Sequence, residues 1–351
     1  MSKESMLDLN RNTKIGCVAE RGPAWHRRDD LQGGIDNHYQ GFIPVADILR
    51  DLFNWDPNTV LVGYLVPCDA KDADYIRKDG VAVRVVESKQ GRVGVLRSDN
   101  DYDMGIFKSD VRHPPYQVTL IERIEALTGT QLGISSAGLL AKGARAWVEM
   151  SMLETLIDDR SGFGYRPNFV AATSMDGSLA HTDALTITAT VCDNTLSWNL
   201  LEAKAAGRLF KRKHTSLSMG DLQEERDVLG IIEQADAEFT RELHELLAIE
   251  LNKAQRIEVM DILVPLPEDE GRAYTIADNR RSALVALDKD PMVEPWVGTA
   301  WGEVQRYNTE QHWLAPIKSE SRSERNTWRS LNGKTREADR QVVQAIEAVV
   351  G

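Results

Sequence analysis

The sequence predicts an α+β fold, in which a twisted, mainly antiparallel sheet packs against helices and continues into a helical C-terminal part. In the first half of the chain, short apolar or alternating segments end at turn residues, as strands do. From residue 221 onward, apolar residues recur instead at helical spacings of three and four. With 351 residues, the chain is long enough for one large core or two modest ones.

Composition narrows the class of protein. The chain is 42% hydrophobic and 27% charged, which is typical of globular proteins. No run of about 18 apolar residues would span a membrane, and the first residues lack an apolar leader, so we expect a cytoplasmic protein. The chain has three cysteines, Cys17, Cys68 and Cys192. Because their number is odd and they lie far apart in the sequence, we expect reduced thiols rather than disulfides or a cysteine zinc site.

The first 150 residues contain several short periodic segments. Pro44 is suited to the first turn of a helix, and Gly91 and the Asp99-Asn100 pair are turn signals between strands. The predicted elements are a helix over 44–53, strands over 60–66, 81–86, 93–96 and 102–107, a helix over 118–127, and a strand over 144–150 that carries Trp147.

The most regular pattern lies between residues 169 and 201. A short apolar strand leads into a turn at Gly177, and alternating apolar residues and threonines predict a second strand over 185–191. A helix should follow directly from residue 196, capped by Asn194 or Thr195. Its free backbone N–H groups would form an anion site at Asn194 and Thr195, although an ordinary strand–helix corner explains the same pattern.

A long acidic helix is predicted over residues 221–260. Between residues 221 and 250, ten acidic residues stand against two arginines, so this segment carries −8 of the net charge of −12. The rest of the chain is nearly balanced, and the overall charge therefore does not exclude a basic face. The Pro-rich segment 264–271 divides a main domain, 1–263, from a C-terminal segment, 264–351, that we expect to pack on the same core. Beyond this boundary, helices are predicted over 275–287 and 335–350.

Two basic segments are candidates for nucleic-acid binding, because cations neutralise phosphates and aromatic rings stack on bases. The first has no acidic residue and contains Lys204, Arg208, Phe210, Lys211, Arg212, Lys213 and His214. The second, over 318–336, contains Arg325, Trp328 and Arg329, and its Ser and Asn content predicts a mobile loop. The alternative for both is a solvated basic surface, in the first case pairing with the acidic helix of another subunit.

Catalytic and metal-binding signatures are absent. The seven histidines lack the spacing of a metal motif, and the chain has neither a phosphate-binding loop of the Walker type nor a G-x-S-x-G nucleophile. We therefore expect no metal and no cofactor. The enzymatic alternative is a metal-dependent nuclease that uses His181, Asp176 and Asp183, with His312 as a further histidine able to meet carboxylates.

Four parts of the chain, in the same order, resemble the phage/plasmid-like family of domain of unknown function 932. They are Pro-Ala-Trp-His at 23–26, the Gly-rich segment 138–147, the Asp-Gly-Ser turn 176–178 with 191–196, and the segments 298–301, 309–312 and 330–333. Residues 173–175 depart from the family's Asn-Ser-His, and Asp193 stands where the family commonly has Asn. The resemblance implies a mobile genetic element and a role at DNA, but no catalytic residue.

These observations favour a non-catalytic protein that binds or anneals single-stranded DNA in recombination or replication and that forms homo-oligomers. The alternatives are the metal-dependent nuclease and a non-enzymatic factor that binds host proteins. No membrane partner is expected.

Overall fold

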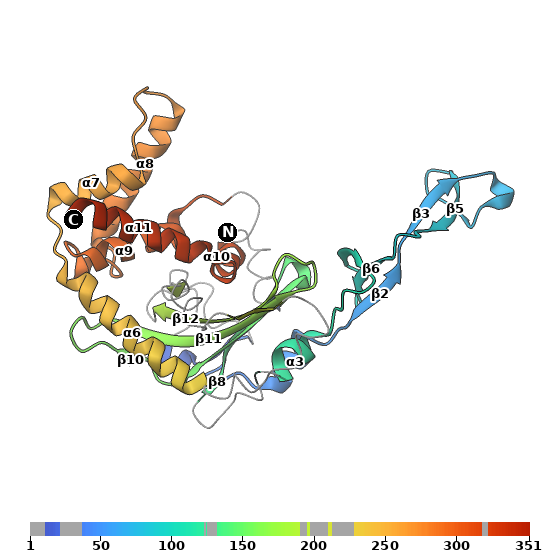
Figure 1. Ribbon diagram of the computed structural model, residues 1–351, viewed down its shortest axis with the longest axis horizontal. Coiled ribbons are helices and arrows are strands. Elements are labelled where there is room, and N and C mark those ends of the chain that lie inside the picture. Colours follow the sequence, from blue (N-terminus) through green and yellow to red (C-terminus); the bar gives the residue numbers. More distant parts are fainter. Residues whose placement is uncertain are drawn as a thin grey trace.

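The computed structural model describes residues 11–21, 37–122, 124, 132–189, 195–196, 210–212, 228–317 and 322–351, and it confirms the α+β class. Figure 1 shows one large curved sheet, with the helices of the C-terminal part of the chain beside it. A thin β arm extends away from the rest of the chain.

Within the described residues, the main sheet has eight strands, and the pairings between them are antiparallel. Its order is β1-β8-β9-β11-β12-β13, with β10 paired to β11 and β14 paired to β12. The strands are β1 (Thr13–Ile15), β8 (Leu132–Leu140), β9 (Arg145–Met152), β10 (Leu156–Ile157), β11 (Gly164–Ser174), β12 (His181–Ala189), β13 (Thr195–Leu196) and β14 (Phe210–Arg212).

The predicted hairpin is confirmed as β11 and β12, and Gly177 in the turn has a φ of +73° that favours glycine. The predicted helix start at residue 196 is wrong. Thr195 and Leu196 instead pair as β13 with Thr188 and Ile187, so the edge of the sheet takes their backbone hydrogen bonds. Asn194 and residues 197–209 lie outside the described residues.

One face of the main sheet is apolar. Val148, Met150, Phe169 and Ala171 occupy matching positions in the strand register and are buried in a single core. This core includes Ile48 and other residues of α3 (Val45–Asp51) and η3 (Gln117–Ile121). The predicted helix at 44–53 is thus confirmed. The one predicted at 118–127 is confirmed in its first part, which begins as the π-helical turn η3, and residues 123 and 125–127 lie outside the described residues.

The opposite face of the same strands carries polar side chains that are nevertheless buried. Asn168 is in register with Ser151 on one side and Thr186 on the other, and each of these three residues is at most 7% exposed. Arg166 and Thr182 are buried on this face as well. Because a buried polar group costs free energy unless it is hydrogen-bonded, this face differs from an ordinary core and is a natural place for function.

The arm consists of two small antiparallel sheets with the orders β2-β6-β7 and β3-β5-β4. The predicted strand over 60–66 is two strands in different sheets, separated by Val62. The other strands of the arm lie close to their predicted positions. Their bounds are β2 (Pro57–Leu61), β3 (Gly63–Pro67), β4 (Tyr75–Ile76), β5 (Ala82–Glu87), β6 (Arg92–Arg97) and β7 (Asp103–Lys108), with short helices α2 (Val18–Arg21) before the arm and η2 (Ala70–Asp72) within it.

The acidic helix is shorter than predicted. It ends at Ala248, and a new helix begins at Lys253. The break follows from two local contacts: Glu250 forms an isolated β-bridge with Thr299, and Asn252 caps the second helix in a reciprocal pair with Gln255. Residues 221–227 lie outside the described residues. The helices from here on are α6 (Val228–Ala248), α7 (Lys253–Leu263), α8 (Arg272–Ala286), η5 (Leu287–Lys289), η6 (Glu294–Trp296), α9 (Ala300–Thr309), η7 (Glu310–Leu314), α10 (Arg322–Leu331) and α11 (Lys334–Val350).

A second core joins these helices to the main sheet. Tyr165 and Ile187 of the sheet, Phe239 of α6, Trp301 of α9 and Ile346 of α11 are all buried in it. The core therefore contains residues from both sides of the Pro-rich segment 264–271. The predicted helices at 275–287 and 335–350 are confirmed as α8 and α11.

Gly138 of β8 lies beneath the indole of Trp147. A Cβ atom at this position would lie 2.1 Å from Trp147 Cη2, so the ring could not keep its place. We expect Gly138→Ala to lower the free energy of unfolding by about 1–3 kcal/mol through overpacking. The matched control is Gly41→Ala, because a Cβ there would meet nothing within 4 Å. Urea unfolding measures both, and equal losses would contradict the close packing at Gly138.

Candidate anion-binding site

Arg145 of β9 brings together three segments that are far apart in the sequence. Its Nε atom donates to Ser178 Oγ at 2.7 Å and lies 3.4 Å from Asp176 Oδ2, both in the hairpin turn. Its guanidinium also lies 3.8 Å from the centre of the Trp328 ring on α10. Three of the segments that carry the family resemblance therefore meet in this region. Arg145 belongs to segment 138–147 and contacts segment 176–178, and the end of α10 belongs to segment 330–333.

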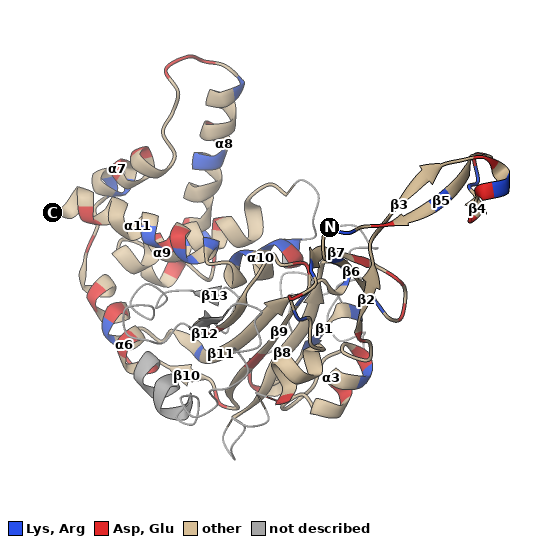
Figure 2. Cartoon of the chain, turned by 45° about the vertical axis from the view of Figure 1, so that its right-hand side comes forward, with Lys and Arg blue, Asp and Glu red and all other residues tan. Residues whose placement is uncertain are grey.

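Trp328 packs α10 onto the main sheet. Its ring and Leu331 lie against a small core on the otherwise polar face, formed by Leu140, Trp147, Val170, Ala172 and Leu179. Figures 1 and 2 both place α10 over the sheet. Arg145 stacks on the Trp328 ring, so this side chain serves in packing, and its predicted stacking on a base stays a prediction.

The segment that carries the second basic patch is a helix over most of its length and not the mobile loop predicted for 318–336. Its Ser and Asn content suggested a loop, but the packing of Trp328 and a contact from Glu324 hold it in place. Glu324 Oε1 accepts a hydrogen bond from the backbone N–H of Ala141 at 2.9 Å. Ala141 and Lys142 both have positive φ angles in the tight turn η4 (Ala141–Gly143) between β8 and β9. Residues 318–321 lie outside the described residues.

Arg322, Arg325 and Arg329 form a row along α10, which we call the arginine row. Their spacing of three and four residues places them along one side of the helix. Arg322 Nη1 donates to the carbonyl oxygen of His312 at 3.2 Å, and Arg325 Nη1 donates to that of Gln311 at 3.1 Å. Arg329 Nη2 lies 3.4 Å from Gln311 Oε1. Within the part of the chain that the structure describes, none of the three has a carboxylate partner.

The arginine row is half-buried, which makes the missing counter-charge costly. Burial lowers the pKa of Arg322 and of Arg329, and the neighbouring charge of Arg325 lowers both further. Arg336 lies in the first turn of α11, and burial lowers its pKa too. Its Nη1 atom is buried without a hydrogen-bond partner. Guanidinium groups held in this way favour an anion that would complete their hydrogen bonds.

Two nearby acids offset only part of the charge of the arginine row, since Asp339 and Glu310 both raise the pKa of Arg329 while burial and Arg325 lower it overall. Glu310 is bound through both carboxylate oxygens by Arg280, at 3.1 and 3.0 Å. Burial raises the pKa of Asp339 to about 7, so this carboxyl group is only partly ionised at neutral pH. Burial, together with the three positive charges of the row, lowers the pKa of His312 to about 3, which keeps its ring neutral. The acids near the row thus compensate the three arginines only in part.

The first predicted basic segment lies beside the same part of the sheet. Phe210, Lys211 and Arg212 form β14, and Lys211 pairs with Thr182 of β12, which in turn pairs with Ala172 of β11. Ala172 contributes to the small core under Trp328, so the Lys211 backbone lies two strands away, about 10 Å, from that core. Lys204, Arg208, Lys213 and His214 lie outside the described residues.

The residues of the nuclease alternative are only partly brought together. His181 Nε2 lies 3.3 Å from Asp183 Oδ1 on β12, whereas Asp176 is bound by Arg145 and by Ser178 in the turn. Among the residues that the structure describes, no three His, Cys, Asp or Glu side chains are placed to hold a metal ion together.

Sequence patterns missed Arg145 and the part played by Gln311. Arg145 is isolated in a strand segment, and its partners Asp176 and Trp328 lie 31 and 183 positions further along the chain. The one signal that could have found it is its place inside the Gly-rich segment 138–147, immediately before the Trp147 strand.

Fold and site together define an α+β protein whose sheet has a buried polar face, crossed by a C-terminal helix that carries a row of half-buried arginines. Residues 111–333, more than half of the chain, match the family described as Domain of unknown function (DUF932), and the chain belongs to this family. The match contains Arg145 and all of α10, whereas the arm precedes it.

No curated protein and no solved structure is significantly similar to the chain. None of the helices in the described ranges combines the length and the apolar character needed to cross a lipid bilayer.

Proposed function

We propose that this chain binds nucleic acid without cutting it, with single-stranded DNA favoured, as a phage- or plasmid-encoded protein of recombination or replication that anneals strands. The observation that carries the proposal is the arginine row: three half-buried guanidinium groups without a carboxylate partner among the described residues.

The geometry of the row favours a polyanion over a single small anion. At about 1.5 Å of rise per residue, Arg322, Arg325 and Arg329 are spaced about 4.5 and 6 Å apart along α10. A chain of phosphates can accept hydrogen bonds from several guanidinium groups in succession, and each contact releases counterions. The basic strand β14, close to the same small core, would extend such a track. Because Arg145 already covers Trp328, the proposal rests on phosphate contacts and needs no stacking on that ring.

The test is a salt titration of binding to labelled single-stranded and duplex DNA, with and without magnesium. For the wild type we expect a steep loss of affinity with salt and a preference for single strands. In the Arg325→Gln/Arg329→Gln variant, affinity should fall, and the slope of log K against log salt should flatten by about 0.7 for each phosphate that the variant no longer neutralises.

The matched control is Arg241→Gln, which removes a positive charge from an exposed residue of α6 that lies 3.9 Å from Glu245. Per charge removed, it should change binding far less than the double variant. Absence of binding at low salt, or equal losses in both variants, would overturn the proposal. Cleavage that requires magnesium would favour the nuclease alternative.

A further inference from the structure

The outer edge of the arm is a nearly continuous strand over residues 57–67. It consists of β2 and β3, with only Val62 between them. β2 pairs with β6 alone and β3 with β5 alone, so within the described residues the other side of both strands is unpaired. Figure 1 shows that this part of the arm extends away from the main sheet and the helices.

Between Pro57 and Pro67, this edge lacks the charged side chains that usually prevent an edge strand from pairing with another chain. Edge strands in monomeric proteins are normally guarded by charged side chains, and residues 57–67 contain none. They do contain Leu61, Tyr64 and Leu65, which are 75%, 55% and 49% exposed. An uncharged β segment with exposed apolar side chains at an open edge is prone to pair with a strand of another chain.

The hydrogen bonds of the arm show which backbone groups point away from it. The carbonyl oxygens of Asp56 and Val62 accept from Ser98 and Ser88, and Cys68 N donates to the carbonyl of Ala82, so the even-numbered residues point into the arm. By strand alternation, the odd-numbered residues point outward. Pro57 and Pro67, which have no N–H to offer, are both odd-numbered, as edge prolines must be.

We propose that two copies of this chain form a dimer by pairing residues 57–67 in antiparallel fashion about a two-fold axis at Val62. Pro57 and Pro67 lie five positions before and after Val62. In this register, Pro57 therefore faces the partner's Pro67 at one end of the ladder, and Pro67 faces the partner's Pro57 at the other end. Leu61 then faces the partner's Gly63, and Thr59 faces the partner's Leu65. Every outward-pointing residue therefore meets an outward-pointing residue.

This symmetry is the reason for assigning the edge to a second copy of the chain. A two-fold pairing uses the same edge on both copies, so it closes at two chains and leaves no free end for further growth. The proposal concerns assembly and does not depend on the proposed nucleic-acid binding.

A cysteine at the axis tests the register directly. Val62 and the partner's Val62 would form a pair without hydrogen bonds, with Cα atoms about 4.5 Å apart, which is within the range of a disulfide. In a Cys68→Ser background, Val62→Cys should give a covalent dimer on mild oxidation. The control is Ile76→Cys on β4, at the opposite edge of the same small sheet and 63% exposed, which should remain monomeric under the same denaturing, non-reducing electrophoresis.

A proline tests the ladder without disturbing the arm. Leu61→Pro removes an outward N–H, as Pro57 and Pro67 already do at equivalent positions, so the pairing of β2 with β6 is kept. In sedimentation equilibrium we expect a wild-type dimer, at least a tenfold rise in its dissociation constant for Leu61→Pro, and no change for Ile76→Lys. A monomeric wild type at micromolar concentrations, or cross-linking of the Val62→Cys variant no faster than that of Ile76→Cys, would overturn the proposal.

Discussion

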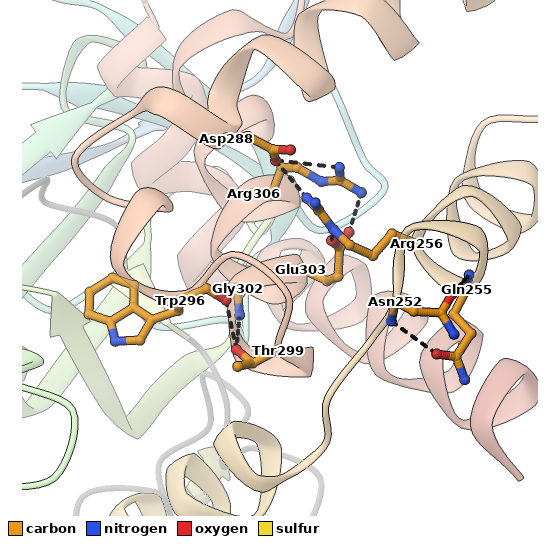
Figure 3. A network of polar contacts seen from close by, with 9 residues as sticks. All are labelled: Asn252, Gln255, Arg256, Asp288, Trp296, Thr299, Gly302, Glu303 and Arg306. Carbon is orange, nitrogen blue, oxygen red and sulfur yellow. Dashed lines mark hydrogen bonds and ion pairs between the residues drawn. The ribbon is translucent and has the colours of Figure 1, made fainter.

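Replacing Glu303 by glutamine is expected to lower the free energy of unfolding by about 3–5 kcal/mol, because it leaves a buried positive charge without its partner. Glu303 and Arg306 are neighbours on α9, and each is 1% exposed. Figure 3 shows how both meet Arg256 of α7 and Asp288 of η5.

The four charged groups of this network balance one another. Arg256 Nε donates to Glu303 Oε1, and its Nη2 donates to Asp288 Oδ1 at 2.6 Å. Arg306 Nη2 donates to the other oxygen of Glu303, and its Nη1 lies 3.7 Å from Asp288. With glutamine at position 303, Asp288 would have to serve two arginines in the interior. The network thus holds α7, α9 and η5 together only while its charges cancel.

The matched control is Asp261→Asn, which removes the carboxylate 2.6 Å from Arg281 Nη2 in the same helical region. Because the Asp261 side chain is 56% exposed, we expect a change within about 0.5 kcal/mol. Urea unfolding followed by tryptophan fluorescence measures both variants. If Glu303→Gln cost no more than Asp261→Asn, the buried network would not be a structural requirement.

Asp339 of α11 is expected to make stability depend on pH between about pH 4 and 7. Burial raises the pKa of this carboxyl group to about 7 in the folded chain, although Asn308 Nδ2 donates to its Oδ1 at 3.0 Å and Arg329 lies near enough to oppose the rise. In the unfolded chain it has its ordinary pKa of about 3.9. The folded state therefore holds a proton that the unfolded state has lost.

The sign follows from this difference in bound protons. The contribution of Asp339 is fully present below about pH 4 and is lost as the pH rises through the folded value near 7. Relative to wild type, Asp339→Asn should gain stability by about 1.4 kcal/mol per pH unit across this window and level off above it. Unfolding free energies of the two proteins, measured from pH 5 to pH 8, provide the comparison.

His312 contributes the opposite slope, since its folded pKa of about 3 lies below the ordinary value near 6.5. Its contribution is present above pH 6.5 and is lost as the pH falls toward 3. Because both proteins carry His312, this effect cancels in the difference between them. Parallel pH profiles for wild type and Asp339→Asn would contradict the raised pKa, whatever the constant offset between the curves.

Local patterns were sufficient wherever one segment determines its own conformation. The alternation of apolar residues and threonines over 185–191, together with Gly177 at the turn, predicted the β11–β12 hairpin. Pro44 and the spacing of Val342 and Ile346 predicted α3 and α11 in the same way. In these elements the short-range preferences agree with the tertiary packing, so a period of 2 or of 3.6 is a sufficient guide.

Local patterns failed where a distant contact changes the outcome. The acidic helix breaks before α7 because Glu250 meets Thr299, 49 positions away, and nothing in the helical periodicity indicates this. The Ser- and Asn-rich composition around α10 suggested a mobile loop, whereas Trp328 and Glu324 dock that segment onto the sheet and the η4 turn. Contacts between residues so far apart leave no local signal in the sequence.

The sequence by itself determined the fold class, the hairpin, the terminal helix and the family, and it showed the basic residues Arg325 and Arg329. Each of these depends only on composition, periodicity or the residues of a motif. Only the tertiary structure decided that one face of the sheet is polar yet buried, that Arg145 joins three distant segments, and that the arginine row lacks carboxylate partners among the described residues. The physical reason is that burial and the choice of counter-charge depend on which segments come to lie together in space, and that arrangement exists only after the chain has folded.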